Sequence, residues 1–302
     1  MLLALFHVAC GSNNAAPTVP VTPVNHSYPF SFSFGTAGPN TGQFNAANGI
    51  VIYQGALFVT DSTNNNLQKF DLNGNFLQST LGNPAQNFSS PYGIAVDSTG
   101  VLYVVDDGHN LIQKLDRNLN YLSSFGSIGT GPGQFTSPEG VGIDSTDRVY
   151  VTEVGNNRIQ RCSNIGTNCL IVGGTTPSAA AGLFNGPTGI SIDKSGNVWV
   201  ADHGNYRIQK FDSNLAFIQA WGTLGIGNGQ FGGPSDVRVD QDGNVIVADL
   251  GGHGVQKLTA SGTYIQQIGT SWGGPKYTAF DSNNNLYVTD WTNNTVSIFR
   301  PN

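Results

Sequence analysis

The chain has few charged residues, few cysteines and little sequence of helical period. Only 11% of its 302 residues are Asp, Glu, Lys or Arg, and the formal net charge is −6. This acidity disfavours a phosphate-binding surface, and with it nucleic acid, as the main partner. After residue 10, no segment is long and apolar enough to span a bilayer.

Glycine, proline and other turn-forming residues are abundant instead. The chain holds 40 Gly and 14 Pro, and 38% of its residues are hydrophobic. A hydrophobic fraction of this size can build a core, and dense turn residues among aromatic and β-branched residues are typical of many short strands. We therefore expect an all-β fold, which at this length can be a single domain.

One stretch, from Pro187 to Asp212, shows the unit from which the chain is built. Its apolar runs at Gly189–Asp193, Val198–Ala201 and Arg207–Phe211 are separated by turn residues, and none keeps a helical period for two turns. Three short strands cannot cover both faces of their own sheet, so the unit requires neighbours of the same kind.

The unit recurs six times between about residue 44 and residue 299. An acidic residue ends the second strand of each copy, at intervals of 41 to 49 residues: Asp61, Asp106, Glu153, Asp202, Asp249 and Asp290. A fourth apolar run follows in most copies, for example Tyr121–Phe125 and Ala216–Trp221. Four strands repeated at this interval predict the blades of a β-propeller.

The repeats resemble the NHL repeat. Asn156–Gln160 (NNRIQ) and Gly204–Gln209 (GNYRIQ) match its N-x-R-I-Q stretch, and Gly93–Asp97 (GIAVD) matches its G-V-A-V-D stretch. The resemblance covers nearly all of the chain after residue 28. It implies a six-bladed β-propeller of four-stranded antiparallel blades.

The two ends of the repeat array complement each other. Phe34 precedes Phe44 by the same ten residues that separate Phe125 from Phe135, so Tyr28–Phe34 resembles a fourth strand with no blade before it. The sixth unit stops at Asn302 after three strands. We expect the N-terminal strand to complete the last blade, which removes exposed sheet edges and places the propeller at residues 28–302.

The first ten residues are apolar and end at Cys10. Val8–Gly11 resembles the lipobox of bacterial lipoprotein signals, although His7 replaces the preferred Leu and no basic segment precedes it. The resemblance implies a lipidated Cys10, a signal remnant at 1–10 and a flexible tether at 11–27. The protein would then be periplasmic or on the cell surface, and would meet the membrane only through its lipid. A frayed apolar N-terminus is the alternative interpretation.

The other two cysteines, Cys162 and Cys169, are seven residues apart in a predicted hairpin. This spacing suits a disulfide across the hairpin loop, worth about 2–3 kcal/mol at most. A metal site is the alternative, but no His or second Cys pair lies nearby in sequence. A disulfide here favours export to an oxidising compartment.

The loops before the first strands and after the second strands share one face of the propeller, whose centre we call the mouth. The residues that precede the first-strand glycine position ring the mouth: Asn48, Tyr92, Glu139, Thr188, Ser235 and Lys276. Glycine follows in the first four units, whereas Asp236 and Tyr277 replace it in the last two. Either the repeat has drifted, or these two residues, with Lys276 and Glu139, form a site for a polar ligand.

Three histidines, His109, His203 and His253, fall in loops on the same face and suggest a metal site. They stand at different distances from their strand ends, and His109 and His253 belong to opposite blades, so we interpret them as polar loop residues. The acidic strand ends, with Arg158 or Arg207 five residues later, are expected to hold the intervening loops.

The resemblance leaves two classes of function open. Related propellers include amidating lyases with a zinc held by His residues at the mouth, a set with no evident match here, and calcium-dependent lactonases. Others are extracellular sensor domains or bind RNA. We expect a monomeric binding module for a protein, a peptide or a small polar ligand. The alternative is a lyase or lactonase that uses zinc or calcium, with Glu139, His203, Asp236 and Tyr277 as first candidates.

Overall fold

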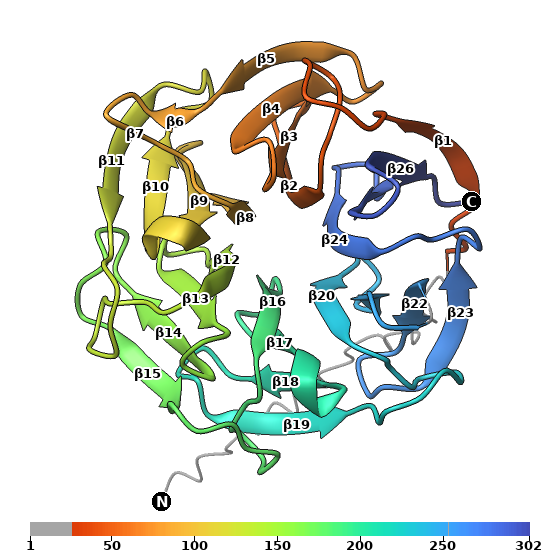
Figure 1. Ribbon diagram of the computed structural model, residues 1–302. Helices are drawn as coiled ribbons and strands as arrows, with labels where there is room; N and C mark the ends of the chain where they lie inside the picture. The colour runs from red at the N-terminus through yellow and green to blue at the C-terminus, as the bar shows by residue number, and fades with distance from the viewer. Residues whose placement is uncertain (1–25, 253) are drawn as a thin grey trace, which may run out of the picture.

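The structure, a computed structural model, describes residues 26–252 and 254–302. The predicted signal remnant with Cys10, nearly all of the predicted tether, and His253 lie outside the described residues. Within the described part, six four-stranded antiparallel sheets form a ring around a central channel, as the repeats predict (Figure 1). We number these blades 1 to 6 in the order of their innermost strands.

Each blade runs from an innermost to an outermost strand. The innermost strands are β2 (Ala47–Tyr53), β8 (Pro91–Val96), β12 (Pro138–Ile143), β16 (Pro187–Ile192), β20 (Pro234–Val239) and β24 (Pro275–Phe280). The second strands are β3 (Ala56–Asp61), β9 (Leu102–Asp106), β13 (Val149–Glu153), β17 (Val198–Asp202), β21 (Val245–Asp249) and β25 (Leu286–Asp290). The third strands are β4 (Asn66–Asp71), β10 (Leu111–Leu115), β14 (Arg158–Cys162), β18 (Arg207–Phe211), β22 (Gly254–Leu258) and β26 (Thr295–Phe299). The outermost strands are β5 (Phe76–Thr80), β11 (Tyr121–Phe125), β15 (Leu170–Gly173), β19 (Phe217–Trp221), β23 (Tyr264–Ile268) and β1 (Phe30–Phe34).

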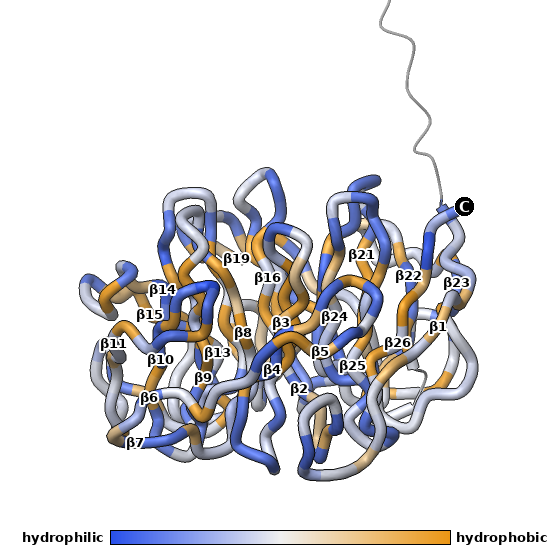
Figure 2. The backbone as a smooth tube through the Cα atoms, turned by 90° about the horizontal axis from the view of Figure 1, so that it is seen from above, coloured by the Kyte–Doolittle hydropathy of each residue, from blue (hydrophilic) through white to orange (hydrophobic). Residues whose placement is uncertain are grey.

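Because neighbouring strands are antiparallel, the connections alternate between two faces of the ring. The upper face carries the leading loops, which enter each innermost strand, and the loops after the second strands, including η1 (Asp107–His109) and η2 (His203–Asn205). The lower face carries the inner turns, between first and second strands, and the outer turns, between third and fourth strands. The leading loop of blade 2 contains a small hairpin, formed by β6 (Gly82–Asn83) and β7 (Gln86–Asn87). Figure 2 shows the ring edge-on, with hydrophobic strands between largely hydrophilic loops.

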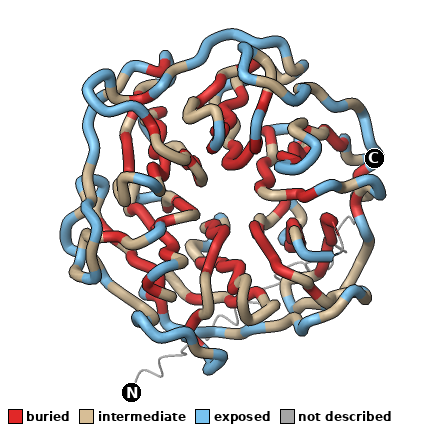
Figure 3. Tube along the Cα trace, in the orientation of Figure 1, coloured by how far each residue is buried: buried red, intermediate tan, exposed pale blue. Residues whose placement is uncertain are grey.

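The hydrophobic core lies between neighbouring blades. One cluster joins Phe58 and Leu67 of blade 1 to Ile94, Val104 and Leu115 of blade 2, and similar clusters fill the other interfaces. Burial is accordingly concentrated in the inner strands and falls toward the outermost ones (Figure 3). A blade that shares its core with two neighbours cannot be stable alone, so the ring folds as one body.

The glycines at the head of the innermost strands allow these strands to approach one another. A Cβ on Gly49 would lie 2.3 Å from the carbonyl oxygen of Tyr92 in the next blade, and one on Gly140 would lie 2.3 Å from that of Thr188. A side chain at these positions would force neighbouring blades apart.

The N-terminal strand closes the ring, as predicted. β1 pairs with β26, so that the sheet order is β1-β26-β25-β24, and β1 lies at the rim of the ring beside the C-terminus (Figure 1). The backbone N–H of Arg300 donates to the carbonyl of Pro29 at 3.2 Å, which continues the ladder. The strand begins at Phe30, because the buried side chain of Tyr28 packs into the core between blades 5 and 6.

Candidate functional site

The repeat sequence builds a rigid upper face around the mouth. In blade 4, Asp202 accepts the backbone N–H of Asn185 in the leading loop at 2.8 Å and the Nε–H of Arg207 at 2.8 Å. Gln209 accepts the N–H of Gly182 at 3.0 Å and donates to the carbonyl of Leu183 at 2.7 Å. The leading loop of blade 4 is therefore held by the acid and the glutamine of the same blade.

Four further blades repeat the glutamine contacts with their leading loops, through Gln68, Gln113, Gln160 and Gln256. In blade 3, buried Arg158 pairs with buried Glu153 at 2.5 Å and donates to leading-loop carbonyls, among them that of Gln134 at 2.9 Å. The acid–arginine pairs therefore have a structural role, as predicted, but most of their contacts are to the leading loop. The predicted contact with the intervening loop is made by the acid, since Glu153 accepts from Asn156 Nδ2 at 2.5 Å.

Three of the predicted mouth residues form structural hydrogen bonds at the channel wall. Asn48 donates to the hydroxyl of Ser62 at 2.7 Å, Thr188 donates to the carbonyl of Pro234 at 3.1 Å, and Ser235 donates to that of Pro275 at 3.0 Å. All three side chains are buried. Two of these bonds cross from one blade to the next, so the residues have a structural role at the channel wall.

The other three predicted mouth residues meet at the centre of the mouth. Lys276 of blade 6 and Glu139 of blade 3 belong to opposite blades, yet Lys276 Nζ lies 2.6 Å from Glu139 Oε1. The ammonium also lies 5.8 Å from the ring centroid of Tyr92 and 6.0 Å from that of Tyr277. A carboxylate and two aromatic rings thus surround one cation at the upper end of the channel.

Tyr277 and Asp236, which replace the repeat glycine, lie beneath this ion pair and are fully buried. The Tyr277 hydroxyl donates to the backbone carbonyl of Glu139 at 3.1 Å. Burial, and then the charges of Glu139 and Asp236, hold the pKa of Tyr277 well above its usual value, so it remains a neutral donor. Asp236 Oδ2 accepts from the backbone N–H and hydroxyl of Thr278 at 2.9 and 2.8 Å and from Arg238 Nε at 3.2 Å. Burial raises the pKa of Asp236, while Arg238 and Thr278 oppose that rise.

Asp107 completes the cluster and is missing from the residues predicted from sequence. It follows Asp106 at the end of β9, and burial, followed by the charges of Glu139 and Asp106, raises its pKa to about 6. Among the described residues its carboxylate has no ion-pair or hydrogen-bond partner. The sequence did contain a signal for Asp107, because only this unit has a second acidic residue directly after the acidic strand end. The other units have Ser62, Val154, His203, Leu250 and Trp291 at this position.

The two predicted loop histidines that the structure describes, His109 and His203, do not come together. His109 Nδ1 lies 3.0 Å from Asp106 Oδ2 in its own blade, and His203 Nδ1 lies 3.2 Å from the carbonyl oxygen of Pro234. His253 is outside the described residues. Across residues 26–252 and 254–302, no group of three or more His, Cys, Asp or Glu side chains has a metal-binding arrangement.

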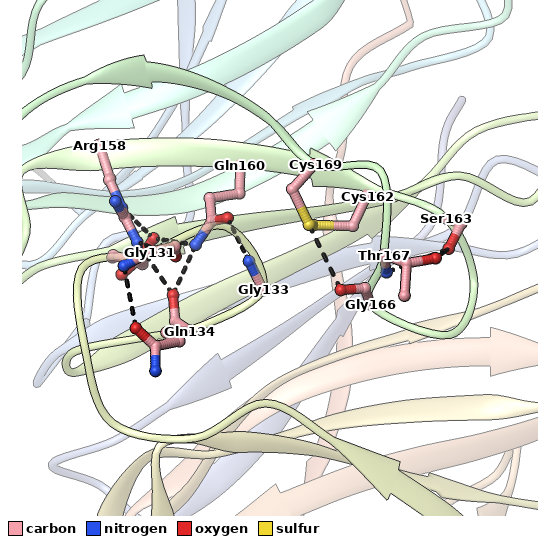
Figure 4. Close-up of a disulfide and its surroundings, with 11 residues drawn as sticks. Gly131, Gly133, Gln134, Arg158, Gln160, Cys162, Ser163, Gly166, Thr167 and Cys169 are labelled. Carbon is pink, nitrogen blue, oxygen red and sulfur yellow. Dashed lines mark hydrogen bonds and ion pairs between the residues drawn. A yellow bond between two sulfur atoms is a disulfide. The ribbon is translucent and has the colours of Figure 1, made fainter.

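Cys162 and Cys169 form a disulfide at the lower end of blade 3 (Figure 4). Cys162 ends β14 and Cys169 directly precedes β15, so the bond spans an outer turn far from the mouth. No helix of the described chain has the length and apolar character needed to cross a membrane.

The geometry agrees with comparisons to known proteins. The family model of the NHL repeat matches residues 135–162, 184–211 and 231–258, which are the first three strands of blades 3, 4 and 5 with the end of their leading loops. No curated protein matches the sequence.

Solved structures with a similar fold cover almost the whole chain. A protein of unknown function from Bacteroides thetaiotaomicron aligns with a TM-score of 0.73 at 14% identity, over 92% of this chain and 77% of that one. Virginiamycin B lyase from Staphylococcus aureus aligns with a TM-score of 0.63 at 16% identity, over 91% and 88%. A gluconolactonase from Xanthomonas campestris aligns with a TM-score of 0.66 at 15% identity, over 87% and 88%. Together with the six sheets and the family-model matches, these alignments establish that the chain is a six-bladed β-propeller containing NHL repeats.

Proposed function

We propose that this propeller is a binding module whose mouth receives a ligand that carries an ammonium group, either a small molecule or a peptide. The observation that carries the proposal is the excess of carboxylate over cation at the mouth. Glu139 pairs with the ammonium of Lys276, and these side chains are 14% and 12% exposed, whereas Asp107, whose carboxylate is close enough to feel the charge of Glu139, has no cation of its own among the described residues.

A second ammonium beside Asp107 would relieve the repulsion between Asp107 and Glu139. It would also lie near the face of Tyr92, where a cation gains further attraction. The rigid leading loops and the cross-channel ion pair hold these groups in place before the ligand arrives, which lowers the entropic cost of binding.

Isothermal titration with the peptide Gly-Gly-Lys and its fully acetylated counterpart tests this proposal. We expect binding of the charged peptide only, and a loss of at least tenfold in affinity in Asp107→Asn. Asp212→Asn, at a partly buried acid in an outer turn of the lower face, is the matched control and should leave the affinity unchanged. Equal binding of the two peptides, or full affinity in Asp107→Asn, would contradict the proposal.

A lyase or lactonase is the second candidate. It is favoured by the fold shared with virginiamycin B lyase and the gluconolactonase, and by the pKa of Asp107 near 6, which suits a general base at neutral pH. Elemental analysis of the purified protein distinguishes the two classes. Stoichiometric zinc or calcium in the purified protein would favour the enzyme, provided that removal of the metal also abolishes hydrolysis of a lactone.

We also propose that the protein is extracytoplasmic and anchored through Cys10. The disulfide supports an oxidising location, since such bonds are rare in the bacterial cytosol. Expression in a bacterium of the gene with its native start should place the protein in the membrane fraction, and Cys10→Ser should release it. An unchanged distribution would refute the anchor.

A further inference from the structure

A cavity lies on the lower face, between blades 4 and 5. It has a volume of about 430 Å³, within the usual range for small-molecule sites. Trp199, Lys210 and Val239 contribute to its walls. It adjoins the lower part of the central channel, a cavity of about 210 Å³, because both are lined by Ile192 and Phe280.

One contact of the repeat is missing at this cavity. In blades 1, 2 and 3 a cation of the third strand donates to a carbonyl in the outer turn of the next blade. Lys69 reaches Arg117 O at 2.9 Å, Lys114 reaches Asn164 O at 3.1 Å, and Arg161 reaches Ser213 O.

The corresponding acceptor for Lys210 is the carbonyl of Ala260. That carbonyl instead accepts from Gln219 Nε2 at 2.6 Å. Lys210 Nζ lies 4.6 Å from the ring centroid of Trp199 and has no hydrogen-bond partner among the described residues. Its ammonium is therefore a free donor inside the cavity.

The carboxylates of the wall are already engaged. Asp193 accepts the backbone N–H groups of Ser195 and Asn197, both at 2.9 Å, and the indole N–H of Trp199 at 3.0 Å. Asp281 is bonded in the same way within its own turn, and Asp240 pairs with buried Lys257 at 3.0 Å. Of the charged side chains in the wall, only those of Lys210 and the exposed Lys194 have no ion-pair or hydrogen-bond partner among the described residues.

The adjoining channel has a mixed lining. Aliphatic side chains of the innermost strands line it together with Thr278 and one charged residue, Arg238, and most of its exposed lining is polar. Arg238 Nε is bonded to Asp236 and to the carbonyl of Thr278 at 3.1 Å. The hydrophobic surface open to an apolar group is therefore that of the lower cavity itself, at Ile192, Val239 and Phe280.

We propose that the lower cavity binds a small organic carboxylate with an apolar body. The carboxylate pairs with Lys210 and Lys194 beside the Trp199 ring, and the apolar body lies against Ile192, Val239 and Phe280 toward the channel. The site is separate from the mouth, because the buried layer of Asp236 and Tyr277 lies between them.

Isothermal titration of the full chain with octanoate and with octylammonium tests the proposal. We expect octanoate to bind at submillimolar concentration and octylammonium to bind at least tenfold more weakly. Lys210→Met should lower the octanoate affinity at least tenfold. Lys114→Met removes the equivalent lysine of blade 2, whose ammonium is engaged, and should have no effect.

A second variant, Ala260→Leu, fills the cavity without changing its charge and should also abolish octanoate binding. Asp107→Asn at the mouth should leave it unchanged, so a failure of this site and a failure of the mouth proposal are distinguishable. No binding to the wild-type protein, equal binding of the two amphiphiles, or full octanoate affinity in both cavity variants would overturn the proposal.

Discussion

Single residues decide how the mouth differs from an ordinary propeller channel. Four blades keep glycine at the head of the innermost strand, and there the neighbouring carbonyl leaves no room for a side chain. Blades 5 and 6 place Asp236 and Tyr277 at that position, and both are buried and hydrogen-bonded. Restoring glycine at both would leave a cavity and unpaired polar groups, so we expect these residues to be required for stability as well as for the mouth.

Asp107 makes stability depend on pH in a defined direction. Its pKa is about 6 in the folded protein and near 3.8 when unfolded, so the folded state binds more protons between these values. Stability should therefore fall as the pH rises from about 4 to about 6. Asp107→Asn removes this loss, and we expect it to stabilise the protein at pH 7 by about 1 kcal/mol after allowance for solvent screening.

Urea unfolding of the two proteins at pH 7 and below pH 4 measures this difference. The two should be equally stable at the lower pH, where the aspartate is protonated in both folded and unfolded chains. A stabilisation of the same size at both pH values would show that the effect is not one of ionisation.

The sequence predicted the positions of the mouth residues better than their contacts. Repeat spacing places Glu139 and Lys276 on opposite blades at the same level, because the period is regular. Whether two such side chains meet depends on channel width, which Tyr277 and Asp236 alter and which no spacing reveals. Asn48, Thr188 and Ser235 could not be separated from them, because hydrogen bonds between strands or blades have no signature in the sequence of a single strand.

At the scale of strands and turns, the N-terminal segment replaces two missing parts of the repeat. In blades 1, 2 and 4 the third-strand lysine lies over an aromatic ring of the second strand, as Lys114 lies 4.8 Å from the ring centroid of Tyr103. Blade 5 has Ile246 opposite Lys257, and Tyr28 supplies the ring at 5.0 Å. Lys257 Nζ also donates to the carbonyl of His26 at 2.9 Å, as its counterparts do to an outer turn. This role of Tyr28 was missed, although the loss of the aromatic at Ile246 was visible in the sequence.

Tyr28→Ala tests the importance of this segment. The side chain is 4% exposed, and its loss should lower the free energy of unfolding by about 3 kcal/mol, a value typical of buried aromatic residues. Tyr121→Ala, on the partly exposed outermost strand of blade 2, is the control and should cost about 1 kcal/mol or less. Similar losses in the two variants, measured by urea unfolding, would show that Tyr28 has no special part in closure.

For the whole molecule, closure should be the main source of cooperativity. Deletion of residues 1–36 removes β1 and Tyr28, exposes the edge of β26 and opens the core of blade 6. We expect a large fall in thermal stability, whereas deletion of residues 11–25 should leave the transition unchanged. Differential scanning calorimetry that gave equal transition temperatures for the two deletions would contradict closure by the N-terminal strand.

The fold could be predicted from the sequence because six copies of one pattern indicate the same structure. The lower cavity could not be predicted. At the cavity, Gln219 and not Lys210 bonds to the carbonyl of Ala260. Such a choice is settled by local packing, and both residues are ordinary members of the repeat.

The pairing of the two chain ends also governs how the ring responds to mechanical load. Phe30 lies opposite Phe299, and the backbone N–H of Asn302 donates to the carbonyl of Ser27 at 3.2 Å. A force that pulls the two ends apart acts on the last pair of this antiparallel ladder first, and each rupture transfers the load to the next pair. The hydrogen bonds therefore open one after another, as in a zipper, at lower force than if they were loaded together in shear. The same blade that gives the ring its thermal cooperativity is thus the place where tension would begin to open it.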